Sequence, residues 1–278
     1  MTDELKKKVD RAIKLIQSAA PRGGVIEVSY SGGKDSDVIL ELTKMADVKY
    51  RAIYKNTTID PPYTIKHCKD NGVEIVRPKL SFFKLVEKNG FPNRYFRFCC
   101  RILKEYKILD KVIIGVRKAE SVKREKIYKE PTACLFLGSK KEHVEAIYPI
   151  LDWSDNDIVK FIEQRNIKLH PLYYREDGSI DAKRRLGCMC CPLAGHKKRL
   201  EYFRKFPNMV KAYIRAGKKF REMHPNQKVV TRFNDVYEWF YNDVFCKSQH
   251  DFEESKMNLF GKRDYKKEIE EYFNIKLK

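Results

Sequence analysis

The sequence predicts an α/β protein with a doubly wound, mainly parallel sheet, followed by a basic helical C-terminal region. In the first half, short β-prone runs alternate with segments whose apolar residues recur at helical spacing, which is typical of parallel strands joined by covering helices. A glycine-rich loop joins the first run to the next helix. From about residue 197 the pattern is helical. The 278 residues suffice for one large domain, or one domain with an appendage.

The expected elements follow in a regular order. A charged amphipathic helix is expected within residues 1–23. Strands are expected at 25–30, 50–54, 73–76 and 112–116, and helices at 37–45, 62–70 and 82–88. A hairpin is expected from 133–137 and 144–150, and a helix capped by Ser154 and ending near residue 165. We therefore divide the chain into an N-terminal helix (1–23), a sheet domain (24–196) and a basic helical region (197–278).

Composition excludes several classes of protein. Hydrophobic residues make up 42% of the chain and aromatic residues 12%, which excludes intrinsic disorder. No apolar run approaches the ~20 residues of a membrane span, and the first twenty residues lack the apolar core of a secretory signal. We expect a cytoplasmic protein with no membrane partner. In that compartment eight cysteines favour thiols, metal ligands or redox groups over structural disulfides.

The positive charge is concentrated in one part of the chain. Of a net charge of +20, residues 183–232 contribute +13, because they hold fifteen Lys and Arg but only Glu201 and Glu222. Such a field attracts phosphate polymers, and nucleic acid is the expected partner. Aromatic residues alternate with the basic ones over 197–221. They could instead be the buried face of ordinary helices.

The loop after the first expected strand has the composition of a phosphate site. Its residues are Ser31, Gly32, Gly33, Lys34, Asp35 and Ser36. Backbone amides and the positive end of the next helix can surround a pyrophosphate there, with Lys34 adding a charge and Asp35 holding Mg²⁺ or orienting the loop. The spacing is not that of the P-loop with four residues between its glycine and Gly-Lys. The alternative is a glycine turn with polar filler.

Four segments in order carry a resemblance to a known family. They are the loop itself, residues 115–121 with Arg124 following, residues 148–154, and residues 170–173 ahead of Gly187 and Cys188. Together, over about residues 24–205, they resemble the phosphoadenosine phosphosulfate (PAPS) reductase family of the adenine-nucleotide alpha-hydrolase (PP-loop ATP pyrophosphatase) superfamily. The resemblance makes 24–196 a nucleotide domain that binds ATP or adenylylated sulfate with Mg²⁺.

The resemblance also implies roles for individual residues. The nucleotide-binding set it implies is Ser31, Gly32, Gly33, Lys34, Asp35, Ser36, Arg117, Glu120 and Ser121. Lys34, Asp35 and Arg117 are the expected catalytic residues, with Arg117 approaching the phosphates from the carboxyl edge of the sheet. The alternative for Arg117 and Glu120 is a surface ion pair. This chain departs from the family at residues 56–58, Asn-Thr-Thr in place of Asp-Thr-Gly, where contacts to ribose or adenine are expected.

The cysteines form two close groups in the sequence. Cys99 and Cys100 are adjacent, and Cys188 and Cys191 form a C-x-x-C. This spacing suits an iron–sulfur cluster or a zinc site with four cysteine ligands. The iron–sulfur branch of the resembled family implies that these four cysteines hold a 4Fe–4S cluster, with zinc or plain buried thiols as alternatives. The remaining assignments are an open role for Cys190, small core positions for Cys68, Cys134 and Cys246, and structural roles for His170 and His196.

The resemblance leaves several functions in competition. The reductases carry a nucleophilic cysteine in a C-terminal Glu-Cys-Gly-x-His string, which this sequence does not contain. The chain is most similar to DNA phosphorothioation proteins, which implies an enzyme that activates a substrate by adenylylation for sulfur transfer to nucleic acid, either DNA or tRNA. A sulfur-donor protein such as a cysteine desulfurase is an expected partner. The alternatives are an adenylylsulfate or phosphoadenylylsulfate reductase that releases sulfite, and a non-catalytic nucleic-acid-binding module.

Overall fold

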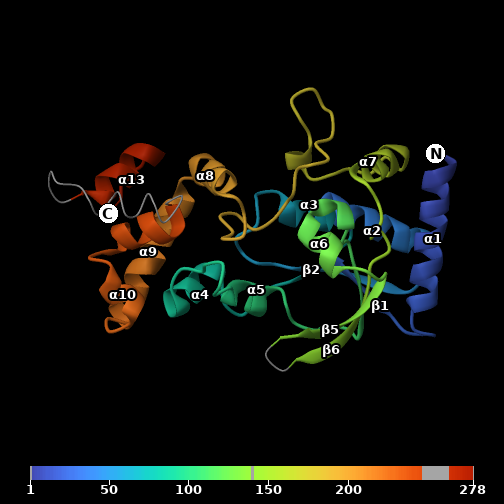
Figure 1. Cartoon of the computed structure of the whole chain (residues 1–278), viewed down its shortest axis with the longest axis horizontal. Helices are drawn as coiled ribbons and strands as arrows, with labels where there is room; N and C mark the ends of the chain where they lie inside the picture. The colour runs from blue at the N-terminus through green and yellow to red at the C-terminus, as the bar shows by residue number, and fades with distance from the viewer. Residues whose placement is uncertain (1, 139–140, 246–262, 278) are drawn as a thin grey trace. The chain divides into compact units, whose positions relative to one another are not determined.

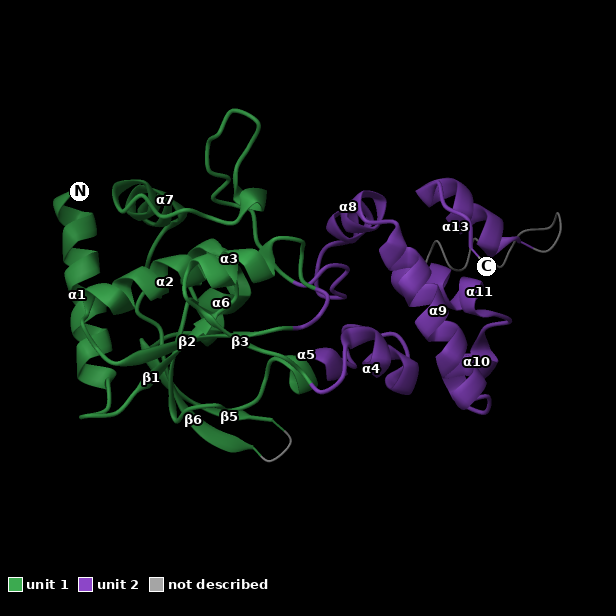
Figure 2. Cartoon of the chain, turned by 180° about the vertical axis from the view of Figure 1, so that it is seen from behind, with its two compact units in different colours: residues 1–56, 60–78, 101–187 green, residues 57–59, 79–100, 188–278 purple. Residues whose placement is uncertain are grey.

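The computed structural model describes residues 2–138, 141–245 and 263–277 (Figure 1). The chain forms two compact units, coloured separately in Figure 2. Unit 1 contains residues 1–56, 60–78 and 101–187. Unit 2 contains residues 57–59, 79–100 and 188–278. Residues 57–59, 79–100 and 188–196, which were expected in the sheet domain, are thus grouped with the C-terminal helices.

Unit 1 contains a six-stranded sheet in the order β3-β2-β1-β4-β6-β5. The strands are β1 Ile26–Tyr30, β2 Tyr50–Lys55, β3 Glu74–Val76, β4 Lys111–Ile114, β5 Thr132–Leu137 and β6 Glu142–Ile147. All neighbours are parallel except β5 and β6, the hairpin at the bottom of Figure 1. From the central β1 the chain winds first through β2 to β3, and later through β4 to β6. The predicted doubly wound, mainly parallel sheet is confirmed.

Helices cover this sheet with the apolar spacing that the sequence shows. They are α1 Asp3–Ala19, α2 Lys34–Met45, α3 Thr64–Asp70, α6 Val122–Ile127 and α7 Asp155–Gln164. In α1 the buried residues Leu5, Val9, Ala12 and Ile16 recur every three or four positions. The expected cap of α7 is confirmed, because the Ser154 side chain accepts a hydrogen bond from the Asp157 amide at 3.1 Å.

One expected core residue is exposed. Cys134 lies on β5, the antiparallel edge strand, whose residues alternate between exposed and half-buried. The prediction that Cys134 is a core residue is therefore wrong, because its position on the pleat turns the side chain to the exposed face. Cys68 is fully buried as expected, and burial raises the pKa of its thiol to about 12. Cys246 lies outside the described residues.

Unit 2 is helical in its described part. Its helices are α4 Phe82–Asn89, α8 His196–Lys205, α9 Asn208–Met223, α10 Lys228–Arg232, α11 Val236–Phe240, the π-helix Tyr241–Phe245 and α13 Tyr265–Phe273, while α5 Phe98–Leu103 begins in unit 2 and ends in unit 1. Helix α4 packs on α9, where a Cβ on Gly217 would lie 2.6 Å from the Phe91 ring. Within the described ranges, no helix combines the length and apolar composition needed to cross a bilayer.

The aromatic residues of the basic tract form the core of unit 2. Tyr202, Phe203, Tyr213 and Phe220 are all buried. The Tyr213 ring lies 5.6 Å from Phe203 and 5.8 Å from Phe91, centroid to centroid. Of the two interpretations of the alternating pattern, the buried helix face is therefore the correct one for these four rings.

Candidate nucleotide site

A pocket of about 230 Å³ lies at the carboxyl ends of β1 and β4. These strands are neighbours, and the chain leaves them toward opposite halves of the sheet, which is the position where open α/β sheets bind ligands. The pocket is lined by Ser29, Ser31, Gly33, Asp35, Ser36, Ile114, Gly115, Val116, Glu120, Arg124, Tyr173, Arg185 and Leu186. All of them belong to unit 1.

The loop after β1 leads directly into helix α2. The helix begins at Lys34, three residues earlier than expected, with Gly33 as its N-cap. Gly32 has φ +74°, and a Cβ there would lie 3.1 Å from Thr64 and 3.3 Å from Leu186. The Ser36 side chain donates to the Gly33 carbonyl at 2.6 Å. The first-turn amides of α2 therefore lie at the pocket, where the helix dipole favours an anion.

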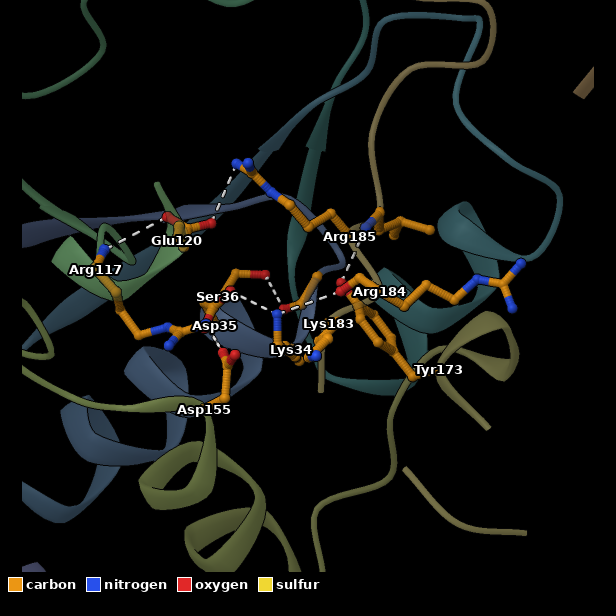
Figure 3. A network of polar contacts seen from close by, with 12 residues as sticks. Lys34, Asp35, Ser36, Arg117, Glu120, Asp155, Tyr173, Lys183, Arg184 and Arg185 are labelled. Carbon is orange, nitrogen blue, oxygen red and sulfur yellow. Dashed lines mark hydrogen bonds and ion pairs between the residues drawn. The ribbon is translucent and has the colours of Figure 1, made fainter. Parts of the chain in front are cut away.

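Lys34 does not line this pocket. Its side chain is buried, and Nζ donates to the Asp35 carboxylate at 3.2 Å and to the Arg184 carbonyl at 3.3 Å (Figure 3). Nζ also lies 5.6 Å from the centroid of the Tyr173 ring. The phosphate contact expected of Lys34 stays a prediction, because its ammonium group is bound to protein in this conformation.

Arg117 is a structural cation in this conformation. It is 1% exposed, and its guanidinium donates to Asp35 at 2.7 Å, to the Trp153 carbonyl at 3.2 Å and to Asp155 at 2.8 Å. Burial opposes its charge, but the two carboxylates outweigh burial and raise its pKa. In Figure 3 the guanidinium points to these carboxylates, and Arg117 does not line the pocket. The alternative, a surface ion pair with Glu120, is wrong, because Arg117 is buried and only its backbone amide contacts that carboxylate, at 3.5 Å. The phosphate contact expected of Arg117 stays a prediction.

Two other arginines take the pocket position expected of Arg117. The Glu120 side chain, 6% exposed, pairs with Arg124 and, at 3.1 Å, with Arg185. Ser121 is exposed and does not line the pocket; its hydroxyl accepts a hydrogen bond from the Arg124 amide and caps α6. Arg124 directly follows a recognised segment. Arg185 belongs to the basic run 183–185, far from the loop in sequence, and only that local charge could have indicated it.

The segment that carries Arg185 lies against the phosphate loop. The Tyr173 hydroxyl accepts a hydrogen bond from the Leu186 amide at 3.0 Å. A Cβ on Gly33 would lie 3.2 Å from that hydroxyl and 3.9 Å from Leu186. This close approach favours glycine at position 33, and it brings the backbone of residues 184–186 to the start of α2.

A buried network of hydrogen bonds holds Asp37, in the first turn of α2. Asp37 accepts hydrogen bonds from the Tyr30 hydroxyl and, at 3.0 Å, from His67 Nε2. Burial raises the pKa of Asp37.

His170 is also buried, with Nε2 2.9 Å from the Pro62 carbonyl, and burial lowers its pKa. His196 Nε2 lies 2.6 Å from the Phe245 carbonyl. Both of these histidines therefore have the structural partners expected of them.

Two of the three residues at 56–58, where the sequence departs from the family, make contacts within unit 2. Thr57 Oγ1 lies 3.5 Å from the Cys188 sulfur, and Thr58 Oγ1 accepts from the Phe82 amide at 2.8 Å. Both threonines belong to unit 2. None of residues 56–58 lines the pocket, so the contacts to ribose or adenine expected there stay a prediction.

All four predicted metal ligands lie in unit 2. A hydrogen bond with Cys100, together with burial and the nearby Cys188 thiol, raises the pKa of Cys99. Burial raises the pKa of Tyr213, and Cys190, Cys99, Cys191 and Cys188 add to that effect in this order. These four thiols are therefore near enough to Tyr213 to influence the pKa of its phenol. In the described residues, however, no group of three or more His, Cys, Asp or Glu side chains is arranged to hold a metal ion.

Comparison with known proteins gives a family match. Residues 25–194 match the family model of the phosphoadenosine phosphosulfate reductase domain. A search of curated proteins gave no match. The crystal structure of phosphoadenylyl-sulfate reductase from Candida auris, in a phosphate complex, has 14% identity, covers 65% of this chain and 95% of that chain, and has a TM-score of 0.44.

Two structures of FMN adenylyltransferase from Candida glabrata are also similar. They have 17% and 16% identity, cover 65% of this chain and 64% of theirs, and have TM-scores of 0.41 and 0.40. One is a complex with FMN and the ATP analogue AMPCPP, and the other with FAD and inorganic pyrophosphate. Identities and TM-scores this low carry no statement about activity.

The Arg117 ion pairs can be tested by their effect on stability. We expect Arg117→Ala to lower the free energy of unfolding by about 3 kcal/mol, because it leaves the largely buried Asp35 carboxylate with Lys34 alone. Arg175→Ala, which removes an exposed arginine from its pair with Asp181, should change it by less than about 0.5 kcal/mol. Urea unfolding of both variants is the measurement. Equal midpoints would refute the structural role.

Proposed function

The chain belongs to the phosphoadenosine phosphosulfate reductase family, and from that premise we propose that unit 1 binds the phosphates of ATP at residues 31–36. The observation that carries the proposal is the pocket itself. It combines the N-terminus of α2 with two arginines, Arg124 and Arg185, that share one buried carboxylate. A phosphate can replace Glu120 as the partner of either arginine, which keeps the positive charges compensated in both states.

The chemistry we propose is adenylylation of an oxygen on the acceptor. That oxygen forms a bond to the α-phosphorus of ATP, and the bond between this phosphorus and the α–β bridging oxygen breaks, so that pyrophosphate leaves with the electron pair. Sulfide sulfur then bonds to the activated atom, and AMP leaves with the electrons of the broken bond. The α2 amides, Arg124 and Arg185 would stabilise the charge that develops on pyrophosphate.

Mg²⁺ is part of the proposal through two carboxylates of the pocket. Asp35 and Glu120 both line it, and carboxylate oxygens are ligands that Mg²⁺ accepts beside nucleotide phosphates. In the structure Asp35 is paired with Lys34 and Arg117, and Glu120 with Arg124 and Arg185. Glu120 is the better candidate, because its partners would be drawn to the phosphates.

Arg185 gives the sharpest test of the nucleotide proposal. We expect Arg185→Gln to weaken ATP binding about tenfold, because a charge-assisted contact to phosphate is lost. Arg175→Gln is the matched control, since Arg175 precedes the same segment, is similarly exposed and lies outside the pocket lining. Calorimetry measures binding, and release of AMP and pyrophosphate from ATP measures turnover. Equal affinities, or ADP as the product, would contradict the assignment.

We propose nucleic acid as the acceptor because of the basic surface of unit 2. The exposed or half-exposed side chains of α9 include Lys211, Arg215, Lys218 and Lys219, and with Lys276 they line a groove of about 550 Å³. Glu222 is the one acidic residue of that lining.

A sulfur-donor protein such as a cysteine desulfurase would deliver sulfur as a persulfide, whose sulfur–sulfur bond a second thiol must then reduce.

The groove predicts a steep salt dependence of nucleic-acid binding. As salt concentration rises tenfold, each phosphate contact should lower the logarithm of the nucleic-acid binding constant by roughly 0.7–0.9. We expect Lys211→Gln, Arg215→Gln and Lys276→Gln together to flatten that slope and leave ATP binding unchanged. The control carries Lys6→Gln, Lys7→Gln and Lys14→Gln, three exposed lysines of α1 with the same change in charge. A slope that is equal in both triple variants would rule out the groove.

We also propose that Cys99, Cys100, Cys188 and Cys191 bind a 4Fe–4S cluster. The donor set is suitable, since thiolates favour iron–sulfur clusters and zinc, although the four side chains must move to form a closed ligand set. Such a cluster would supply electron transfer or sulfur handling when bound. Cys190 is buried with φ +58°, so its backbone places the C-x-x-C turn in a left-handed conformation that non-glycine residues rarely adopt.

The cysteine proposal predicts selective loss of iron. In anaerobically purified protein, Ser in place of Cys99, Cys100, Cys188 or Cys191 should lower iron content and brown colour. Cys68→Ala and Cys134→Ser serve as buried and exposed controls and should keep both. Metal analysis decides the matter: native iron in all four single variants, or zinc in the parent protein, would overturn the cluster.

A second candidate function is reduction of adenylylated sulfate, which the family description itself favours. It would release sulfite from adenylylsulfate or phosphoadenylylsulfate in the presence of a thiol. The two candidates therefore differ in product, sulfite against AMP with pyrophosphate. Thiol-dependent sulfite release in the absence of nucleic acid would replace the sulfur-transfer proposal.

A further inference from the structure

The most exposed aromatic ring of unit 2 lies outside the basic tract. Tyr202, Phe203, Tyr213 and Phe220 are buried and cannot contact a ligand by their faces. Tyr95, in contrast, is 99% exposed, the highest value among the large hydrophobic and aromatic side chains of the described residues. Any stacking surface that accompanies the basic charge of unit 2 must therefore be sought around Tyr95.

Tyr95 projects from a fixed turn. The Asn93 side-chain oxygen accepts hydrogen bonds from the amides of Tyr95 at 2.9 Å and of Phe96 at 2.8 Å, and the Asn93 amide donates to the Phe96 carbonyl at 3.3 Å. The Phe96 ring lies 5.5 Å from the buried ring of Phe98. The turn is thus anchored on one aromatic side chain while it holds the next one in solvent, which lowers the ordering cost of binding through Tyr95.

Positive charge surrounds the same turn. Arg94 and Arg97 flank the two aromatic residues and are exposed. Guanidinium groups on both sides of an exposed ring are placed to pair with the backbone phosphates of a strand whose base stacks on that ring.

From these contacts we infer that residues 93–97 bind an unpaired nucleotide of the acceptor nucleic acid. Tyr95 stacks on the base, and the exposed Arg94 and Arg97 hold the adjacent phosphates. A base in a duplex is already stacked on both faces, so the turn requires a single strand or a base that has left its helix. The inference rests on the proposed nucleic-acid acceptor, and it specifies that the acceptor is recognised as a single-stranded segment.

The test uses the full chain and a single-stranded oligonucleotide that contains 2-aminopurine. The parent protein should quench its fluorescence on binding, because the base stacks on Tyr95. We expect Tyr95→Ala and Tyr95→Leu each to weaken single-strand binding between about 5- and 100-fold and to lose the quenching. Tyr95→Phe keeps the ring and should bind within about twofold of the parent. Phe136→Ala, at a ring 67% exposed on β5, is the control and should match the parent.

The outcomes separate the inference from the function on which it rests. If Tyr95→Leu binds the single strand as tightly as the parent, the contact is not aromatic stacking and the inference falls. If Tyr95→Ala weakens duplex and single strand equally, the preference for an unpaired base falls. In both cases the nucleic-acid acceptor survives through the α9 groove. If the parent binds neither form at low salt, the inference and the acceptor fall together, and unchanged ATP binding in every variant shows that unit 1 is intact.

Discussion

The ion pairs of the buried Arg117 guanidinium are the interactions on which the candidate nucleotide site depends. This side chain joins Asp35, in the first turn of α2, to Asp155, the first residue of α7, and it follows β4 in the chain. Three segments that leave the sheet at different places are thus fixed to one side chain. Each guanidinium nitrogen donates one hydrogen bond, and the three acceptors are two carboxylates and one carbonyl. In this conformation the charge of Arg117 is therefore compensated by protein.

The other cations at or near the pocket are also paired with carboxylates. Arg124 and Arg185 are paired with Glu120, and Lys34 with Asp35. Binding of a phosphate at this pocket is therefore an exchange of partners, in which the gain from each new contact is reduced by the loss of an old one. An exchange of this kind favours ligands with several negative oxygens, because they can replace both arginine contacts at once. The pairs with Glu120 and Asp35 also compensate the positive charge near the pocket before a phosphate binds.

The sequence predicts much of the fold and less of the site. Alternating runs predict the parallel sheet because hydrophobic periodicity is a local property, and Ser154 is found by its capping pattern. The direction in which Arg117 points is not local, since it depends on Asp35 and Asp155. Arg185 contributes to the pocket from more than sixty residues beyond β4, a separation that no spacing rule covers. Cys134 is misplaced because an apolar run does not reveal that its strand is the edge of the sheet.

The division of the chain between the two units has a consequence for biosynthesis. Helix α4 belongs with α9, and more than a hundred residues separate them along the chain. At ordinary rates of translation α4 therefore waits on the order of ten seconds for its packing partner to be made. Until then Phe91 has no Gly217 to cover it. While α9 is still to be made, the apolar residues that α4 buries against it stay exposed on the nascent chain, which makes aggregation a risk before the core of unit 2 forms.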